Sequence, residues 1–85
     1  MPDIVWVGTD SGNEGDWATN ANWSSGAVPI GSDDVYFEDS SQSVPSGLDQ
    51  SGVELDSLNI GQSYTGSIGT DSTALQIESP IVEIG

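Results

Sequence analysis

The sequence predicts an all-β protein whose short strands stack as successive coils. Apolar and polar residues alternate in short pairs through the second half of the 85-residue chain, which places both apolar side chains of a pair on one face of a strand. Two successive pairs recur in the same order at nearly equal intervals, a spacing typical of a solenoid. No stretch shows a helical period of useful length. The pairs are Val53/Leu55 and Leu58/Ile60, which recur as Leu75/Ile77 and Val82/Ile84.

The first half of the chain is expected to hold two strands joined by a long folded loop. Runs of β-prone residues indicate the strands, and Gly, Pro, Asn, Asp and Ser indicate the turns between them. The same even spacing of short strands leaves a small antiparallel β-sandwich open as the alternative fold. In chain order we expect a strand at Ile4–Val7, a helical turn at 18–22 with Asp16 as its N-cap, a strand at Asp33–Glu38, a Ser-rich turn at 39–47, and a third side of the first coil at 64–69.

The tryptophans are expected to nucleate the core. All three lie between residues 6 and 23 of a chain with few other aromatic residues, and each buries a large apolar surface. An exposed platform of the three indoles and Tyr36 for stacking sugar rings is the less favoured reading. The predicted core comprises Trp6, Trp17, Trp23, Tyr36, Leu58, Ile60, Leu75 and Ile77.

The charge balance restricts the partners. The chain has 14 Asp and Glu, no Lys, Arg or His, and a formal net charge of −14. No side-chain salt bridge can form within it, and binding to nucleic acid or to an anionic membrane is disfavoured because both require positive charge. A solvated acidic surface explains the carboxylates most simply, and a basic partner surface or bound cations are the alternatives.

Catalysis is not expected. Without Cys, His or Lys, no group is available to activate the many serines as nucleophiles. Asp33 and Asp34 are neighbours on a strand and therefore point to opposite faces, so they do not form a catalytic pair. The Asn22-Trp23-Ser24 glycosylation pattern is interpreted as chance.

The loop at 10–16 is the candidate cation site, since it gathers oxygen ligands of the kind that calcium prefers. Its spacing is not that of an EF-hand, and a turn-rich loop whose side chains bond their own backbone is favoured. We expect no cofactor and no metal, with calcium as the weaker alternative. Its ligands would come from Asp10, Asn13, Glu14 and Asp16.

A set of short motifs in the first half resembles a known opening. They are Trp6-Val7-Gly8, Gly15-Asp16-Trp17, Asn22-Trp23, Gly26-Ala27-Val28-Pro29 and Asp33-Asp34-Val35. The series is similar to the start of many large bacterial surface proteins (autotransporter-like) and of some phage virion proteins, and Leu58-Asn59-Ile60-Gly61 with 64–69 resembles their first coils. The resemblance implies a Trp-rich cap at 1–47 and right-handed parallel β-helix coils at 48–85, in one structural domain that a longer parent would continue.

The resemblance implies a structural role. Because the chain starts without a leader, we expect a non-catalytic phage virion protein: a capsid decoration protein or the base of a fibre, assembled in the host cytoplasm. Its partner would be a shell protein or copies of itself as a homo-oligomer. The alternative is a glycan-binding or adhesive module of a bacterial surface protein.

Overall fold

The computed structural model describes residues 3–70, 72–79 and 82–84, and in them strands predominate. The one helical segment among these residues is a single 3-10 turn, so the expected all-β class fits. The elements are β1 (Asp3–Val5), η1 (Asn20–Asn22), β2 (Asp34–Phe37), β3 (Asp49–Glu54), β4 (Ser57–Ile60), β5 (Gln76–Glu78) and β6 (Val82–Ile84).

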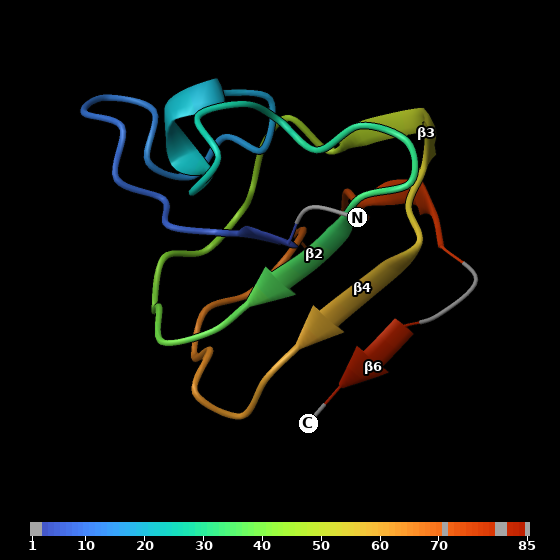
Figure 1. Cartoon of the computed structure of the whole chain (residues 1–85). Helices are drawn as coiled ribbons and strands as arrows, with labels where there is room; N and C mark the ends of the chain where they lie inside the picture. Colours follow the sequence, from blue (N-terminus) through green and yellow to red (C-terminus); the bar gives the residue numbers. More distant parts are fainter. Residues whose placement is uncertain (1–2, 71, 80–81, 85) are drawn as a thin grey trace.

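The described strands pair in parallel. Four of them form a sheet in the order β1-β2-β4-β6, and β3 pairs with β5 in a second, two-stranded sheet (Figure 1). An isolated parallel bridge joins Val44 to Ile68, and among the described residues only the bridge between Trp6 and Trp23 is antiparallel. The antiparallel sandwich is therefore wrong for the part of the chain that the structure describes.

The register of the paired strands confirms one predicted recurrence and corrects the other. Leu58 pairs with Val82, as predicted. The recurrence of Val53 at Leu75 is wrong, because it would align Glu54 with Gln76, whereas Glu54 pairs with Glu78. The pairing of β3 with β5 shifts between Asp49 and Glu54, so six residues of β3 lie against three of β5. Such an irregularity changes the register without leaving a clear trace in the apolar pattern.

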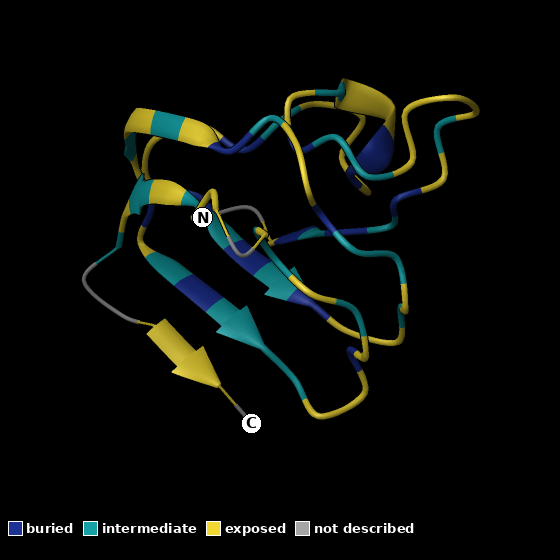
Figure 2. Cartoon of the chain, turned by 180° about the vertical axis from the view of Figure 1, so that it is seen from behind, coloured by how far each residue is buried: buried dark blue, intermediate teal, exposed yellow. Residues whose placement is uncertain are grey.

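The aromatic core confirms the burial of the tryptophans. Trp6, Trp17 and Trp23 expose at most 2% of their surface. Figure 2 shows buried and half-buried residues alternating along β2, the strand that supplies Phe37 to the same core. Trp23 packs edge-on against the other two indoles, with ring centroids 5.0 and 4.7 Å apart, and the centroid of the Phe37 ring lies 5.7 to 5.8 Å from all three. Edge-to-face pairs of this kind contribute about 0.5–1.5 kcal/mol beyond the area they bury.

The three indole N–H groups differ in their hydrogen-bond partners. Trp23 Nε1 donates to the Trp17 carbonyl at 2.8 Å, and Trp6 Nε1 donates to the Gln42 carbonyl at 3.2 Å. Tyr64 donates to that same Gln42 carbonyl at 2.8 Å. Trp17 Nε1 is buried and has no hydrogen-bond partner among the described residues.

A fully buried asparagine holds the Trp-rich loop in shape. Asn22 accepts a hydrogen bond from the Asp10 N–H at 2.8 Å, and its amide donates to the carbonyls of Asn13 and Asp16 at 2.6 and 2.9 Å. The Asn22 side chain thus provides hydrogen-bond partners for three backbone groups of the loop, in the way that a neighbouring strand would in a sheet. This burial leaves the Asn22 amide inaccessible in the folded chain, which agrees with interpreting the glycosylation pattern as chance.

The helical turn forms, but its expected cap is wrong. The turn is confined to Asn20–Asn22, its N-cap is Thr19, and no side chain bonds the cap. Asp16 lies further upstream, where its carboxylate accepts hydrogen bonds from Ala18 N–H at 3.3 Å and Thr19 Oγ1 at 2.6 Å. The turn begins only at Asn20, so Asp16 lies four residues before it and is not next to its first N–H groups.

Candidate interaction site

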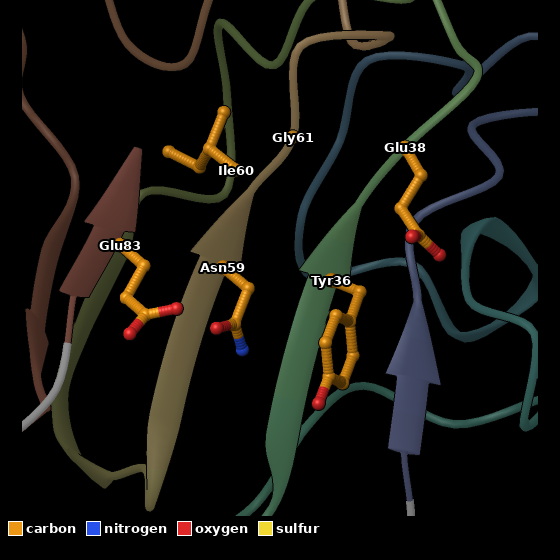
Figure 3. A pocket seen from close by; sticks show the side chains of 6 residues that line it. All are labelled: Tyr36, Glu38, Asn59, Ile60, Gly61 and Glu83. Carbon is orange, nitrogen blue, oxygen red and sulfur yellow. The ribbon is translucent and has the colours of Figure 1, made fainter. Parts of the chain in front are cut away.

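The outward face of the larger sheet presents one row of polar and aromatic side chains. Strand pairing aligns Val5, Tyr36, Asn59 and Glu83, while the alternate row of Ile4, Val35 and Leu58 is buried. The alternation follows from the two-residue period of a strand. Figure 3 shows the side chains of Tyr36, Asn59 and Glu83 standing side by side on β2, β4 and β6.

A cavity of about 290 Å³ opens over this row. The phenol ring of Tyr36 forms one wall, and the other groups come from β4, β6 and the residues that follow β2 and β4 (Figure 3). Glu38 and Glu83 are exposed at its margin, whereas Tyr36 and Asn59 are half-buried. Its lining residues are Tyr36, Glu38, Asn59, Ile60, Gly61 and Glu83.

Hydrogen bonds to β2 and to its own strand β4 fix the orientation of the Asn59 amide. Its Nδ2 donates to the Val35 carbonyl at 3.2 Å and to Ser57 Oγ at 3.0 Å, which uses both N–H groups. The Oδ1 atom has no hydrogen-bond partner among the described residues. Ser57 in turn donates to the Asp34 carboxylate at 2.6 Å, so the amide is held by a chain of bonds along the sheet.

The electrostatic field at the cavity is negative. The charge of Asp3 raises the pKa of the Tyr36 phenol above its ordinary value, and burial and the charges of Asp34, Glu38 and Glu83 raise it further. Each carboxylate opposes the formation of a phenolate, because like charges repel. The same field favours a positive charge placed over the ring.

The core is open on the β6 side. The aligned inward residues Val35, Leu58 and Val82 are 0%, 5% and 55% exposed. In the next inward row, Phe37 is fully buried, Ile60 is half-buried and Ile84 is 75% exposed. An apolar surface therefore remains uncovered where β6 ends the described sheet.

The structure corrects one predicted core residue. Tyr36 lies on the outward face and lines the cavity, because it alternates with the buried Val35 and Phe37. Trp6, Trp17, Trp23 and Leu58 are buried, as predicted. The other predicted members, Ile60, Leu75 and Ile77, are partly buried and pack against the core cluster. Residues that the prediction missed complete the core, namely Ile4, Val35, Phe37, Val44, Leu48, Leu55 and Tyr64.

The oxygens of the candidate calcium loop bond within the protein. Asp10 accepts a hydrogen bond from Asn13 Nδ2 at 3.1 Å, Glu14 from the Gly12 N–H at 3.3 Å, and Asp16 from Ser46 Oγ at 3.4 Å. Among the described residues no group of three or more acidic side chains is placed to share a cation. Two of these bonds join side chains, and nearby backbone N–H groups donate to Glu14, from Gly12, and to Asp16, from Ala18.

Asp33 and Asp34 separate as the strand period requires. Asp33 is buried, and its carboxylate accepts a hydrogen bond from the Ile30 N–H at 2.8 Å, whereas Asp34 accepts one from Ser57. The two carboxylates thus accept hydrogen bonds from different parts of the chain.

No described helix is long and apolar enough to cross a membrane.

Comparison of the chain with protein-family models, with curated proteins and with solved structures found no match. The site is therefore interpreted from its own geometry. Tyr36, Asn59 and Glu83 follow one another at nearly the same interval as the apolar pairs do. That signal was present in the sequence and would have placed the three side chains in one row.

Proposed function

We propose that the chain forms the cap and first coils of a parallel β-helix, and that it is a non-catalytic virion structural protein. In this proposal the open apolar end at β6 docks on a shell protein. The observation that carries the docking surface is the exposure of Val82 and Ile84, whose aligned neighbours are buried or half-buried. The virion context is supported by the resemblance of the Trp-rich opening.

The recurring parallel pairings support the β-helix. Asp34 pairs with Ser57, Val44 with Ile68, and Glu54 with Glu78, so three successive segments each meet a later segment in the same order. The three separations along the chain are nearly equal, as they must be when each coil adds one strand to each side of the helix. A parallel connection of this kind is right-handed in nearly all known cases.

Docking at β6 would gain both apolar contact and backbone hydrogen bonds. Covering Val82 and Ile84, now 55% and 75% exposed, is worth roughly 2–3 kcal/mol. β6 is also the last strand of the described sheet, and an edge strand can pair with a strand of another chain. A partner that supplies one strand would satisfy both surfaces together.

The charge favours a different protein over a second copy. The chain has a net charge of −14 and no Lys or Arg, so two copies repel each other. A shell protein with a basic docking surface would instead be attracted. We therefore assign the open end to a basic shell protein, with a homo-oligomer or a further coil of a longer parent chain as the competing occupants.

The test compares wild-type chain with Ile84→Asp and Ile30→Asp, each produced in the cells that naturally make the protein. Both isoleucines are exposed, 75% and 67%, and both substitutions add one negative charge, but only Ile84 lies at the open end. Virus particles are banded on a density gradient, and the bound chain is quantified by mass spectrometry. Urea unfolding of each purified variant verifies that it folds.

Wild type and Ile30→Asp should band with the particles, whereas Ile84→Asp should be lost from them. Absence of the wild-type chain from particles would overturn the virion role. A defined oligomer of the isolated chain at physiological ionic strength that Ile84→Asp dissociates would replace the shell protein by a second copy.

The glycan-binding alternative draws on the same cavity at Tyr36. A platform built from the three indoles is not on the surface, since Trp6, Trp17 and Trp23 are buried, and Tyr36 alone of the four predicted rings faces outward. Recovery of the chain with the cell envelope and its retention on a glycan array would favour this alternative over the virion role.

A further inference from the structure

The polar groups of the Tyr36 cavity are almost all hydrogen-bond acceptors. Glu38 and Glu83 contribute carboxylates that accept no hydrogen bond from the described residues, and Asn59 contributes the Oδ1 that its two N–H bonds leave free. Among the lining side chains, only Tyr36 has a hydrogen-bond donor, its hydroxyl, that is still free to bond a ligand. A ligand that fits this set must supply donors and need few acceptors.

We propose that this cavity binds an arginine side chain of the docked protein, with the guanidinium stacked on the face of the Tyr36 ring that is turned to β4 and its N–H groups directed to Asn59 and Glu83, while Glu38 adds negative charge from the other side of the ring (Figure 3). The inference rests on the proposed function, because it takes the arginine to come from the protein partner.

A guanidinium matches the cavity better than the other common ligand groups do. It is planar, always charged and carries five donors with no acceptor, and it stacks on aromatic faces. A lysine ammonium is compact and strongly hydrated, and it cannot stack flat on the face of the Tyr36 ring as a planar guanidinium does. Sugar hydroxyls both donate and accept, and the cavity offers them few donors.

The surrounding charges favour the same occupant. The raised pKa of Tyr36 shows that Asp3, Asp34, Glu38 and Glu83 all act on the phenol. The chain has no Lys, Arg or His of its own, so no cationic side chain of the chain can neutralise this field. A cation from another protein would therefore meet the carboxylates of Glu38 and Glu83 at the cavity, with Asp3 and Asp34 adding to the negative field around it.

The experiment titrates the isotope-labelled isolated chain with a blocked Gly-Arg-Gly peptide and follows the Asn59 side-chain amide and the Tyr36 ring by NMR. Peptides with citrulline, a neutral isostere of arginine, or with lysine replace it in parallel titrations, and methyl glycosides test neutral sugars. The variants are Tyr36→Phe, Tyr36→Ala, Glu83→Gln and Asp56→Asn. Asp56 is an exposed carboxylate before β4 and outside the cavity lining, so it controls for the change in net charge.

The arginine peptide should give saturable shifts at both probes, and citrulline should bind at least about fivefold more weakly, as expected for loss of cation–π and ionic contacts. Tyr36→Ala should weaken binding about fivefold and Glu83→Gln about two- to fivefold, whereas Tyr36→Phe and Asp56→Asn should leave it nearly unchanged. Urea unfolding verifies that each variant is folded.

Equal binding of citrulline or tighter binding of a neutral sugar would overturn the arginine assignment, as would an undiminished affinity in Tyr36→Ala. These titrations use the isolated chain, so their failure leaves particle docking through Ile84 intact. Conversely, arginine binding by a chain that is absent from particles would overturn the virion role alone.

Discussion

The three buried indoles allow one substitution to be compared at three sites. Trp6, Trp17 and Trp23 are equally buried, but their N–H groups differ in partner. Changing each in turn to Phe removes the same atoms from the same core. The loss of packing is therefore similar, and differences in the free energy of unfolding report on the hydrogen bonds.

Trp23→Phe should be the most destabilising of the three. It removes the 2.8 Å bond to the Trp17 carbonyl and leaves that buried acceptor without its donor, which costs about 1–3 kcal/mol. Trp17→Phe removes a buried N–H that has no partner among the described residues, so it relieves a penalty of about 1–3 kcal/mol. Even at the low ends of these ranges, the two variants should differ by about 2 kcal/mol.

Trp6→Phe is the internal control and should fall between them. It loses the 3.2 Å bond to the Gln42 carbonyl, but that carbonyl still accepts the Tyr64 hydroxyl at 2.8 Å. The acceptor therefore stays satisfied, and only the net value of one bond, about 1 kcal/mol, is lost.

The assay is equilibrium unfolding in urea, followed by circular dichroism. With a denaturant slope of about 1 kcal/mol/M for a small protein, the midpoints of Trp17→Phe and Trp23→Phe should lie about 2 M apart. Equal slopes are required for the comparison. If Trp17→Phe proved as destabilising as Trp23→Phe, the assignment of hydrogen bonds in the core would be refuted.

Two further predictions concern the buried polar groups. Asn22→Ala removes three hydrogen bonds within the loop and should lower the free energy of unfolding by about 3 kcal/mol. The control Asn13→Ala, at an exposed position, should lower it by under about 1 kcal/mol. Urea midpoints measure both variants, and similar losses would contradict the role of Asn22. Burial raises the pKa of Tyr64 to about 12 from its ordinary value of 10.0, so its contribution to stability is complete below pH 10 and declines as the pH rises through 12. Tyr64→Phe should flatten that alkaline decline, and an unchanged slope in unfolding measurements from below pH 10 up to pH 12 would argue against it.

Part of the candidate site, the outward row of side chains on the larger sheet, could be predicted from the sequence. Tyr36, Asn59 and Glu83 recur at nearly equal intervals, so a stacked-strand interpretation applied to polar residues would have aligned them. The predicted core includes Tyr36 instead, because a large aromatic side chain is more often buried. The strand period decides the matter, since Val35 and Phe37 on either side both face inward.

The sequence alone determined the all-β class, the tryptophan core and the recurrence of Leu58 at Val82, because apolar alternation and the burial of large rings follow from local chemistry. Tertiary structure alone decided the shift of β3 against β5 and the presence of a cavity over Tyr36 that Glu38 also lines. It also decided which indole N–H lacks a partner among the described residues. These features depend on where segments that are separated in the chain come together in space, and the local pattern of apolar and polar residues does not specify that placement.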